Sequence, residues 1–290
     1  MKKFLIVAAA AGIIGGAPML AQASPHDDLV AFRAFFHKRF PTVKFADYKD
    51  GIYAVPAGQV RRSAWEDFIS FAPPYEDAVA IGKKLYNTPF ANGKTYASCF
   101  PNGGLGIKQN YPYFDASTGQ IVTFEGAINA CRVQNGEKPY PWGKGKLAAV
   151  SAYMGSTANG KKIDVKVPND PRALAWYERG KRHFYSKRGQ LNFSCADCHV
   201  YNSGEHIRGE VVSPALGHTT HFPVWRKKWA AGAGENPLGG LGTIERRYTG
   251  CNKQVRQKPF KIQSDEYKAL EYFETYMSDG LEVNTPSLRQ

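Results

Sequence analysis

A C-x-x-C-H motif restricts the fold of this 290-residue chain more than any other feature. It consists of Cys195, Cys198 and His199, with Ala-Asp between the cysteines. Two cysteines at this spacing attach a c-type haem through thioether bonds, and the adjacent imidazole binds the iron. The motif therefore predicts one covalently bound haem c, with His199 as its proximal ligand.

The N-terminus has the pattern of a secretory signal peptide. Two lysines precede the apolar segment 4–20, and an A-x-A cleavage site ends at Ala23. We expect cleavage after Ala23, which removes residues 1–23 and leaves the mature protein in the periplasm, where haem c attachment and disulfides belong. A retained N-terminal anchor is the alternative. No later segment is long and apolar enough to span a membrane, so no membrane span is expected in the mature chain.

The charge of the chain favours anionic partners. Removing the two lysines of the signal peptide from the 38 basic residues leaves 36 against 25 acidic ones, a formal charge of +11. A basic surface attracts anionic substrates and acidic proteins. Nucleic acid is not expected as a partner, because the chain is exported and has no helix-turn-helix or zinc-finger spacing.

The region before the haem motif has a counterpart earlier in the chain. A Gly-Lys pair at Gly180 precedes Cys198 by 18 residues, and a similar pair at Gly82 precedes Cys99 by 17. In both places a tyrosine and a second glycine lie between. Aligned in this way, the two halves place Cys99 opposite Cys198.

The regions downstream of these cysteines repeat as well. Cys131 and Cys251 are lone cysteines, and each precedes an amphipathic segment, 146–154 in the first half and 267–277 in the second. Coincidence is the alternative for any single match, but the shared order of features favours a tandem duplication. We therefore expect a mostly α-helical protein with two tandem cytochrome c-like modules.

Prolines set the expected boundary between the modules. Pro168 and Pro171 interrupt the helical patterns on either side of them. The predicted N-terminal module is 24–168. The haem-binding module with the active site is 169–290.

The N-terminal module is predicted to lack haem. Tyr96 and Phe100 occupy the positions where a C-x-x-C-H motif would need its first cysteine and its histidine. Cys99 and Cys131 should then point into the same vacated pocket, and in an exported protein they are expected to form a disulfide. Two free buried thiols are the alternative.

Cys251 remains as the odd cysteine. It lies 52 residues beyond His199, just before the C-terminal helical segment, where small cytochromes c place their distal iron ligand. Met277 is the competing ligand, but Leu270, Phe273 and Met277 follow helical core spacing. A thiolate at Cys251 is therefore the favoured distal ligand, and it would lower the reduction potential.

Arg247 lies four residues before Cys251 and would share a helical face with it. A guanidinium beside the sulfur would lower the pKa of the thiol and offer paired donors to an oxyanion. A solvated surface arginine is the alternative.

These motifs together resemble the SoxA family, the catalytic haem subunits of the SoxAX cytochromes of thiosulfate oxidation. The similarity rests on the C-x-x-C-H motif, the R-x-x-x-C segment at 247–251, and an upstream half with Ile-Asn-Ala-Cys-Arg at 128–132. It extends over nearly the whole mature chain. Some members carry two haems in this subunit, and this sequence resembles the form with one.

The resemblance implies an L-cysteine S-thiosulfotransferase. Such a protein joins thiosulfate oxidatively to a cysteine of a SoxY-type carrier (SoxYZ), and the electrons leave through haem to a SoxX-type small cytochrome c in a heterodimer. Cys195 and Cys198 match the covalent haem cysteines and His199 the proximal ligand. Cys251 matches the distal ligand and the nucleophile, which can carry a persulfide, and Arg247 matches the substrate-binding arginine.

The residues alone leave two other classes open. One is a periplasmic electron-transfer cytochrome in which Met277 or a group without sulfur is distal, and the other is a haem sensor or structural subunit. His218 and His221 have H-x-x-H spacing that can bind a metal. Without a third ligand nearby, a structural or surface role is favoured for both.

Overall fold

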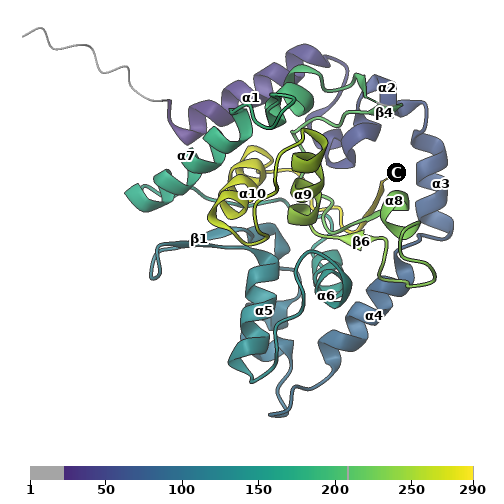
Figure 1. Cartoon of the computed structure of the whole chain (residues 1–290), viewed down its shortest axis with the longest axis vertical. Coiled ribbons are helices and arrows are strands. Elements are labelled where there is room, and N and C mark those ends of the chain that lie inside the picture. The colour runs from purple at the N-terminus through teal and green to yellow at the C-terminus, as the bar shows by residue number, and fades with distance from the viewer. Residues whose placement is uncertain (1–22, 208, 290) are drawn as a thin grey trace, which may run out of the picture.

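The computed structural model describes residues 23–207 and 209–289 (Figure 1). The predicted signal peptide, except for Ala23, lies outside the described residues. The fold is mostly α-helical, as the repeat pattern predicted. Within the described residues, no helix is long and apolar enough to cross a bilayer.

Short 3-10 segments connect the helices of the first half. The helices are α1 (Pro25–Arg39), α2 (Pro56–Gln59), α3 (Arg62–Phe71), α4 (Glu76–Asn87), α5 (Phe124–Gln134) and α6 (Gly145–Ser156). The 3-10 segments are η1 (Phe45–Ala54), η2 (Tyr96–Cys99), η3 (Pro101–Gly104) and η4 (Lys108–Asn110).

The second half combines helices with small sheets. Its helical segments are α7 (Pro171–Tyr185), the π-helical turn η5 (Asp197–Tyr201), α8 (Lys227–Ala230), α9 (Ile244–Gln254) and α10 (Asp265–Met277). Strands β1 (Tyr113–Asp115) and β2 (Gln120–Val122) lie in the first half. The strands of the second half are β3 (His206–Ile207), β4 (Glu210–Val211), β5 (Val224–Arg226), β6 (Leu241–Gly242) and β7 (Ser287–Arg289). Strands β1 and β2 form one antiparallel pair and β3 and β4 another, while β5 lies between antiparallel β6 and parallel β7.

Each half contains one pair of helices that cross at a glycine. Helix α4 packs on α6 and α7 packs on α10. A Cβ atom at Gly82 would lie 2.0 Å from the carbonyl oxygen of Ala149, and one at Gly180 would lie 2.1 Å from that of Ala269. Glycine is therefore required at both crossings, because only a residue without a side chain allows the backbones to approach this closely.

The N-terminal helix joins the core of the second half. Phe32 and Phe36 of α1 are buried in the same hydrophobic cluster as Phe184 and Phe273. The carboxylate of Asp28 accepts a hydrogen bond from the Tyr177 hydroxyl at 2.8 Å. Figure 1 shows α1 running beside α7. The spatial grouping thus differs from the order of the chain, since α1 precedes α4, α5 and α6 in sequence.

A separate core fills the first half. It contains aromatic and aliphatic side chains of α5, α6 and η2. Among them, Tyr96, Phe124 and Met154 are fully buried. Cys99 and Cys131 pack against or within this core and form a disulfide, with 5.7 Å between their Cα atoms. The pairing expected from the repeat is present in the structure.

Candidate haem and sulfur site

A short capped turn carries the C-x-x-C-H motif. The Ser194 amide and hydroxyl donate to the Asp197 carboxylate at 2.8 and 2.9 Å, and the Asp197 amide donates back to the Ser194 hydroxyl at 3.0 Å. This reciprocal pair is a capping box, which fixes where a helical turn begins. Cys195 and Cys198 therefore lie on a locally ordered turn that continues into η5.

The loop before the motif is attached to the end of α9. Gly189 has a φ of +69°, and a Cβ there would lie 2.0 Å from the carbonyl oxygen of Val255. The Leu191 amide donates to the same carbonyl at 3.3 Å. These contacts link the haem-attachment segment to the helix that carries Cys251.

His199 is oriented for metal binding. Its Nδ1–H donates to the carbonyl oxygen of Ser213 at 2.8 Å, which leaves Nε2 free to bind iron. Burial lowers the pKa of His199, with a smaller opposing effect of the Ser213 hydrogen bond. The imidazole is thus held in its neutral form, the form that binds a metal.

The imidazole ring of His218 packs against the ring of His199. The His218 ring stacks on the His199 ring with 4.7 Å between centroids, and Nδ1 of His218 lies 3.6 Å from the Glu274 carboxylate. Glu274 also accepts a hydrogen bond from the buried Tyr248 of α9. His218 and His221 are both buried, so the surface role considered for them is wrong. Among the described residues, no group of three or more His, Cys, Asp or Glu side chains is arranged to hold a metal ion.

Helix α9 presents Arg247 and Cys251 on one half-exposed face. The neighbouring positions, Tyr248 and Asn252, are buried and anchor the helix. The Tyr267 hydroxyl donates to Asn252 Oδ1 at 2.5 Å. Residues four apart share a helical face. Tyr248 and Asn252 therefore lie on one face, which is turned inward, and Arg247 and Cys251 lie on the neighbouring face, which is half-exposed.

The side chains of α9 and of the attachment turn are close enough to shift one another's pKa values. Burial raises the pKa of the Cys195 and Cys198 thiols, and the nearby Cys251 raises both further. The positive charge of Arg247 acts in the opposite direction on Cys198. The three cysteines, His199 and Arg247 therefore surround one region, although they come from segments about 50 residues apart.

These residues fit a c-type haem. Cys195 and Cys198 are half-buried free thiols on the attachment turn, and thioether formation requires free thiols. His199 is a half-buried, neutral imidazole with one nitrogen unengaged. Cys251 is a third half-buried free thiol. Met277 is 1% exposed within the core, as its helical spacing indicated.

Arg226 is a site residue that sequence reasoning missed. It ends β5, and its Cζ lies 5.4 Å from the centroid of the Trp229 ring. Burial, together with the positive charge of Arg247, lowers the pKa of Arg226 to about 10, and Cys251 opposes this shift. Arg226 is thus a second half-buried cation near Cys251. No local pattern marks it, because its approach depends on the pairing of β5 with β6 and β7.

Comparisons with known proteins agree with this site. A family model described as the SoxA/TsdA cytochrome c domain matches residues 81–163. The L-cysteine S-thiosulfotransferase subunit SoxA of Chlorobaculum tepidum is 51% identical over 93% of this chain and 89% of its own length. The subunit of the same name from Allochromatium vinosum is 47% identical over 99% of this chain and 96% of its own.

A solved structure is also similar. The crystal structure of SoxXA from P. pantotrophus contains a chain that matches with a TM-score of 0.69 and 29% identity, covering 79% of this chain and 84% of that one. The similarity of sequence and of structure thus extends well beyond the haem motif. On this evidence the chain belongs to the SoxA family.

Proposed function

We propose that this protein is the SoxA subunit of an L-cysteine S-thiosulfotransferase. It joins thiosulfate to a cysteine of a SoxY-type carrier within a SoxYZ protein, and electrons leave through haem to a SoxX-type small cytochrome c. The observation that supports this most directly is the pairing of Arg247 and Cys251 on one face of α9, beside the haem-attachment turn. An electron carrier without sulfur chemistry needs neither residue there.

The overall reaction is an oxidation that forms a sulfur–sulfur bond. A carrier thiol and thiosulfate combine to give the cysteine S-thiosulfonate, releasing one proton and two electrons. The charges balance, because the thiol is neutral, thiosulfate carries −2 and the conjugate carries −1. Haem c, when bound, supplies one-electron acceptor chemistry, and the second electron requires a second acceptor such as the partner cytochrome.

The residues of this chain bind and orient the reactants. Arg247 offers two parallel N–H donors to the sulfonate oxygens of thiosulfate. Cys251 supplies the sulfur nucleophile, as a thiolate or persulfide, and would also bind the iron of the haem. Cys195 and Cys198 would hold the haem covalently, and His199 would bind its iron.

We further infer that the chain consists of two tandem cytochrome c-like modules, 24–168 and 169–290, with one haem in the second and with α1 of the first module packed against the core of the second. The glycine crossings of α4 with α6 and of α7 with α10 support this division. The cytochrome c family model matches 81–163, a region without a C-x-x-C-H motif. In that region the Cys99–Cys131 disulfide lies in a core filled by aromatic and aliphatic side chains.

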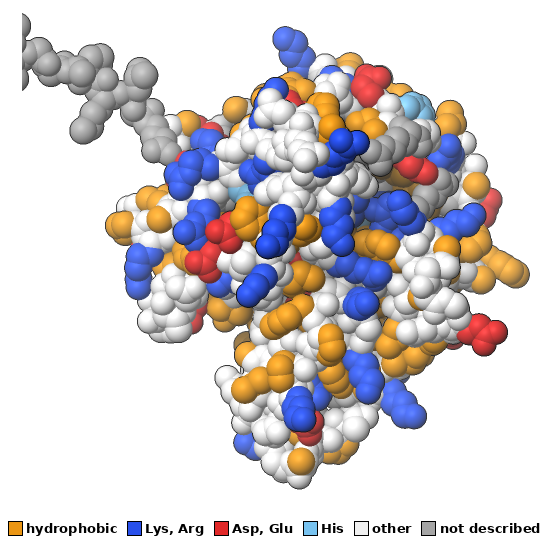
Figure 2. Space-filling view, viewed as in Figure 1, with side chains coloured by type: hydrophobic (Ala, Val, Ile, Leu, Met, Phe, Trp, Pro, Cys, Tyr) orange, Lys and Arg blue, Asp and Glu red, His pale blue; other side chains and the backbone are white. Residues whose placement is uncertain are grey.

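The surface fits anionic reactants and partners. Figure 2 shows lysine and arginine side chains spread across the face that carries α9. Such a surface attracts the thiosulfate dianion and acidic proteins. We place the mature protein in the periplasm, after cleavage of the signal peptide at Ala23, as a heterodimer with the SoxX-type cytochrome.

A conjugation assay tests the proposed function. The haem-loaded protein, with its small cytochrome partner, is incubated with thiosulfate and carrier, and the intact mass of the carrier is measured. We expect a thiosulfonate adduct with the wild type and with Lys253→Met, an exposed position on the same helix. We expect no adduct with Cys251→Met. Full conjugation by Cys251→Met would overturn the proposal.

A further inference from the structure

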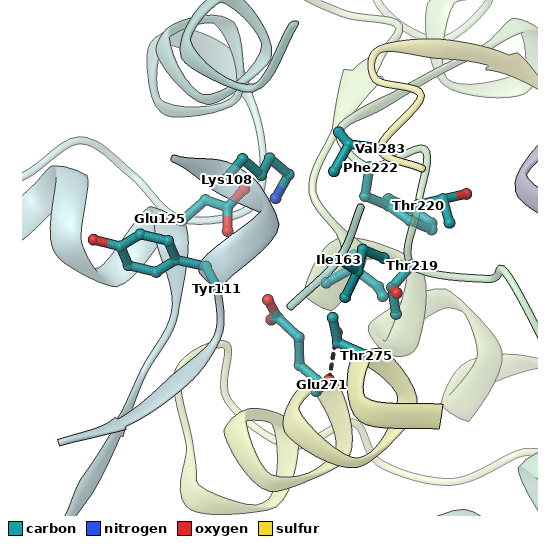
Figure 3. A pocket seen from close by; sticks show the side chains of 11 residues that line it. Lys108, Tyr111, Glu125, Ile163, Thr219, Thr220, Phe222, Glu271, Thr275 and Val283 are labelled. Carbon is teal, nitrogen blue, oxygen red and sulfur yellow. Dashed lines mark hydrogen bonds between the residues drawn. The ribbon is translucent and has the colours of Figure 1, made fainter. Parts of the chain in front are cut away.

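A small cavity lies between residues of the two halves. Its volume is about 20 Å³, and its walls include Lys108 and Glu125 from the first half and Thr219, Thr220 and Glu271 from the second. Figure 3 shows the Lys108 ammonium and the Glu271 carboxyl pointing toward the space between them. This cavity is separate from the site around Cys251, because neither the three free cysteines nor Arg247 line it.

Two polar atoms at this cavity have no partner. Thr219 Oγ1 and Glu271 Oε2 are buried, and neither forms a hydrogen bond within the described residues. The residues themselves are 9% and 5% exposed. Buried polar atoms in native proteins are nearly always hydrogen-bonded to protein or to ordered water. Two unpartnered atoms on residues that line one cavity therefore indicate that the cavity binds a hydrogen-bonding ligand.

The neighbouring carboxyl groups already have partners. Glu125 accepts a hydrogen bond from the Ser151 hydroxyl at 2.6 Å, and Glu245 accepts one from the Gln263 side-chain amide at 3.0 Å. Glu125 and Glu245 occupy equivalent positions, each the second residue of its helix, α5 or α9. Glu271 differs from them, because one of its oxygens is left for a ligand.

We propose that the cavity binds one water molecule, which hydrogen-bonds to Thr219 Oγ1 and Glu271 Oε2 and completes a hydrogen-bonded carboxyl cluster between the two halves. The volume supports a single occupant, since a cavity needs about 10–15 Å³ on this measure to hold one water. The lining also supplies the two to four polar partners that an ordered water needs.

A cation is a poorer occupant than water. The Lys108 ammonium already places a positive charge at the cavity wall. Burial raises the pKa of Glu271 well above its usual value and that of Glu245 to about 8, with repulsion from Glu125 adding to both. Lys108 opposes the first shift and Lys268 the second, while Glu274 adds to the first. Protonated carboxyl groups attract a cation weakly.

The water would connect this cluster to the helix of the reactive cysteine. Glu245 lies in the first turn of α9, and its carboxylate also accepts a hydrogen bond from the backbone amide of Gln263, in the loop before α10. Glu271 lies on α10. Both the start of α9 and α10 are thus tied to the same buried cluster, which supports the position of α9 in the folded protein.

A high-resolution crystal structure of the haem-loaded protein tests the proposal. We expect one density peak within hydrogen-bonding distance of both Thr219 Oγ1 and Glu271 Oε2. We expect the peak to remain in Thr219→Ser and to disappear in Thr219→Val. An empty cavity in the wild type would overturn the proposal, and so would a peak with the short, multiple oxygen contacts of a metal cation.

Thermal unfolding provides an independent measurement. Thr219→Val should lower Tm by roughly 2–4 °C relative to Thr219→Ser, because the water loses one partner. Wild-type Tm should be the same in sodium, potassium and choline chloride at equal ionic strength. A specific rise in Tm with sodium or potassium would identify a cation and contradict the proposal.

Discussion

Arg247 lies one helical turn before Cys251 on the half-exposed face of α9, while the adjacent Tyr248 and Asn252 anchor the neighbouring, buried face. This arrangement holds a guanidinium and a thiol on a common surface without burying either one. An oxyanion can approach the arginine while its terminal sulfur faces the cysteine. The account of function depends on this relationship.

Replacing Arg247 should mainly weaken thiosulfate binding. Hydrogen bonds to charged groups contribute about 1.5–3 kcal/mol, so Arg247→Ala should lower kcat/KM for thiosulfate by roughly 10- to 150-fold. Arg247→Lys should lower kcat/KM by a smaller factor, because an ammonium keeps the positive charge but lacks the paired donors. Steady-state kinetics against thiosulfate measure the effect, with Lys253→Ala as the control on the same helix. An unchanged kcat/KM in Arg247→Ala would contradict the assigned role.

The glycine at the crossing of α7 and α10 should not tolerate a side chain. In Gly180→Ala the new methyl group would lie 2.1 Å from the Ala269 carbonyl oxygen, so the two helices must separate. We expect a loss of about 3 kcal/mol or more in the free energy of unfolding, measured by urea denaturation. Gly232→Ala is the control, because the nearest atom to its new methyl would be 3.8 Å away. Equal stabilities for the two variants would show that the crossing is not tightly packed.

The disulfide should stabilise the protein without affecting the haem. Closing the 32-residue interval between Cys99 and Cys131 is expected to contribute about 3 to 4 kcal/mol. The Cys99→Ala, Cys131→Ala double variant should lose this much free energy of unfolding. Its haem absorption spectrum should not change, because neither cysteine belongs to the site around His199. Loss of covalent haem in a folded double variant would be inconsistent with the assignment of Cys195 and Cys198.

Glu245 should make the protein less stable as the pH rises. Its pKa in the folded protein, about 8, is above the ordinary value of 4.5, so the folded state binds the proton more tightly than the unfolded state. The stabilisation is complete below about pH 4.5 and is lost progressively as the pH rises toward 8. Glu245→Gln should flatten this decline in urea denaturation measured from pH 5 to 8. Glu266→Gln, a half-buried carboxylate of α10, should leave the slope unchanged, and an identical slope for Glu245→Gln would refute the effect.

Local sequence patterns predicted the haem-attachment turn and the equivalent positions in the two halves. The spacing of C-x-x-C-H defined the attachment turn, and the glycines at 82 and 180 marked two equivalent positions that both become helix crossings. The lone cysteines of the two halves, Cys131 and Cys251, also marked equivalent positions, since each lies in the eighth position of its helix, α5 or α9. These features depend on a few neighbouring residues, so they can be read from the sequence.

Contacts between distant segments could not be predicted in the same way. Helix α1 contributes Phe32 and Phe36 to the core of the second half, although the periodicity of its aromatic residues shows only that one face is buried. Arg226 reaches the site through the pairing of β5 with β6 and β7. Glu125 and Glu271 meet only because the two halves pack together. No spacing within a single segment encodes which distant surface covers it.

Low-temperature electron paramagnetic resonance of the oxidised, haem-loaded protein tests the central claim most directly. The account predicts a low-spin signal of histidine and thiolate ligation, which is lost in Cys251→Met while the haem stays covalently attached. Lys253→Met should keep the wild-type signal. A histidine and methionine signal that is the same in the wild type and in Cys251→Met would place another residue on the iron, contradicting the assigned role of Cys251.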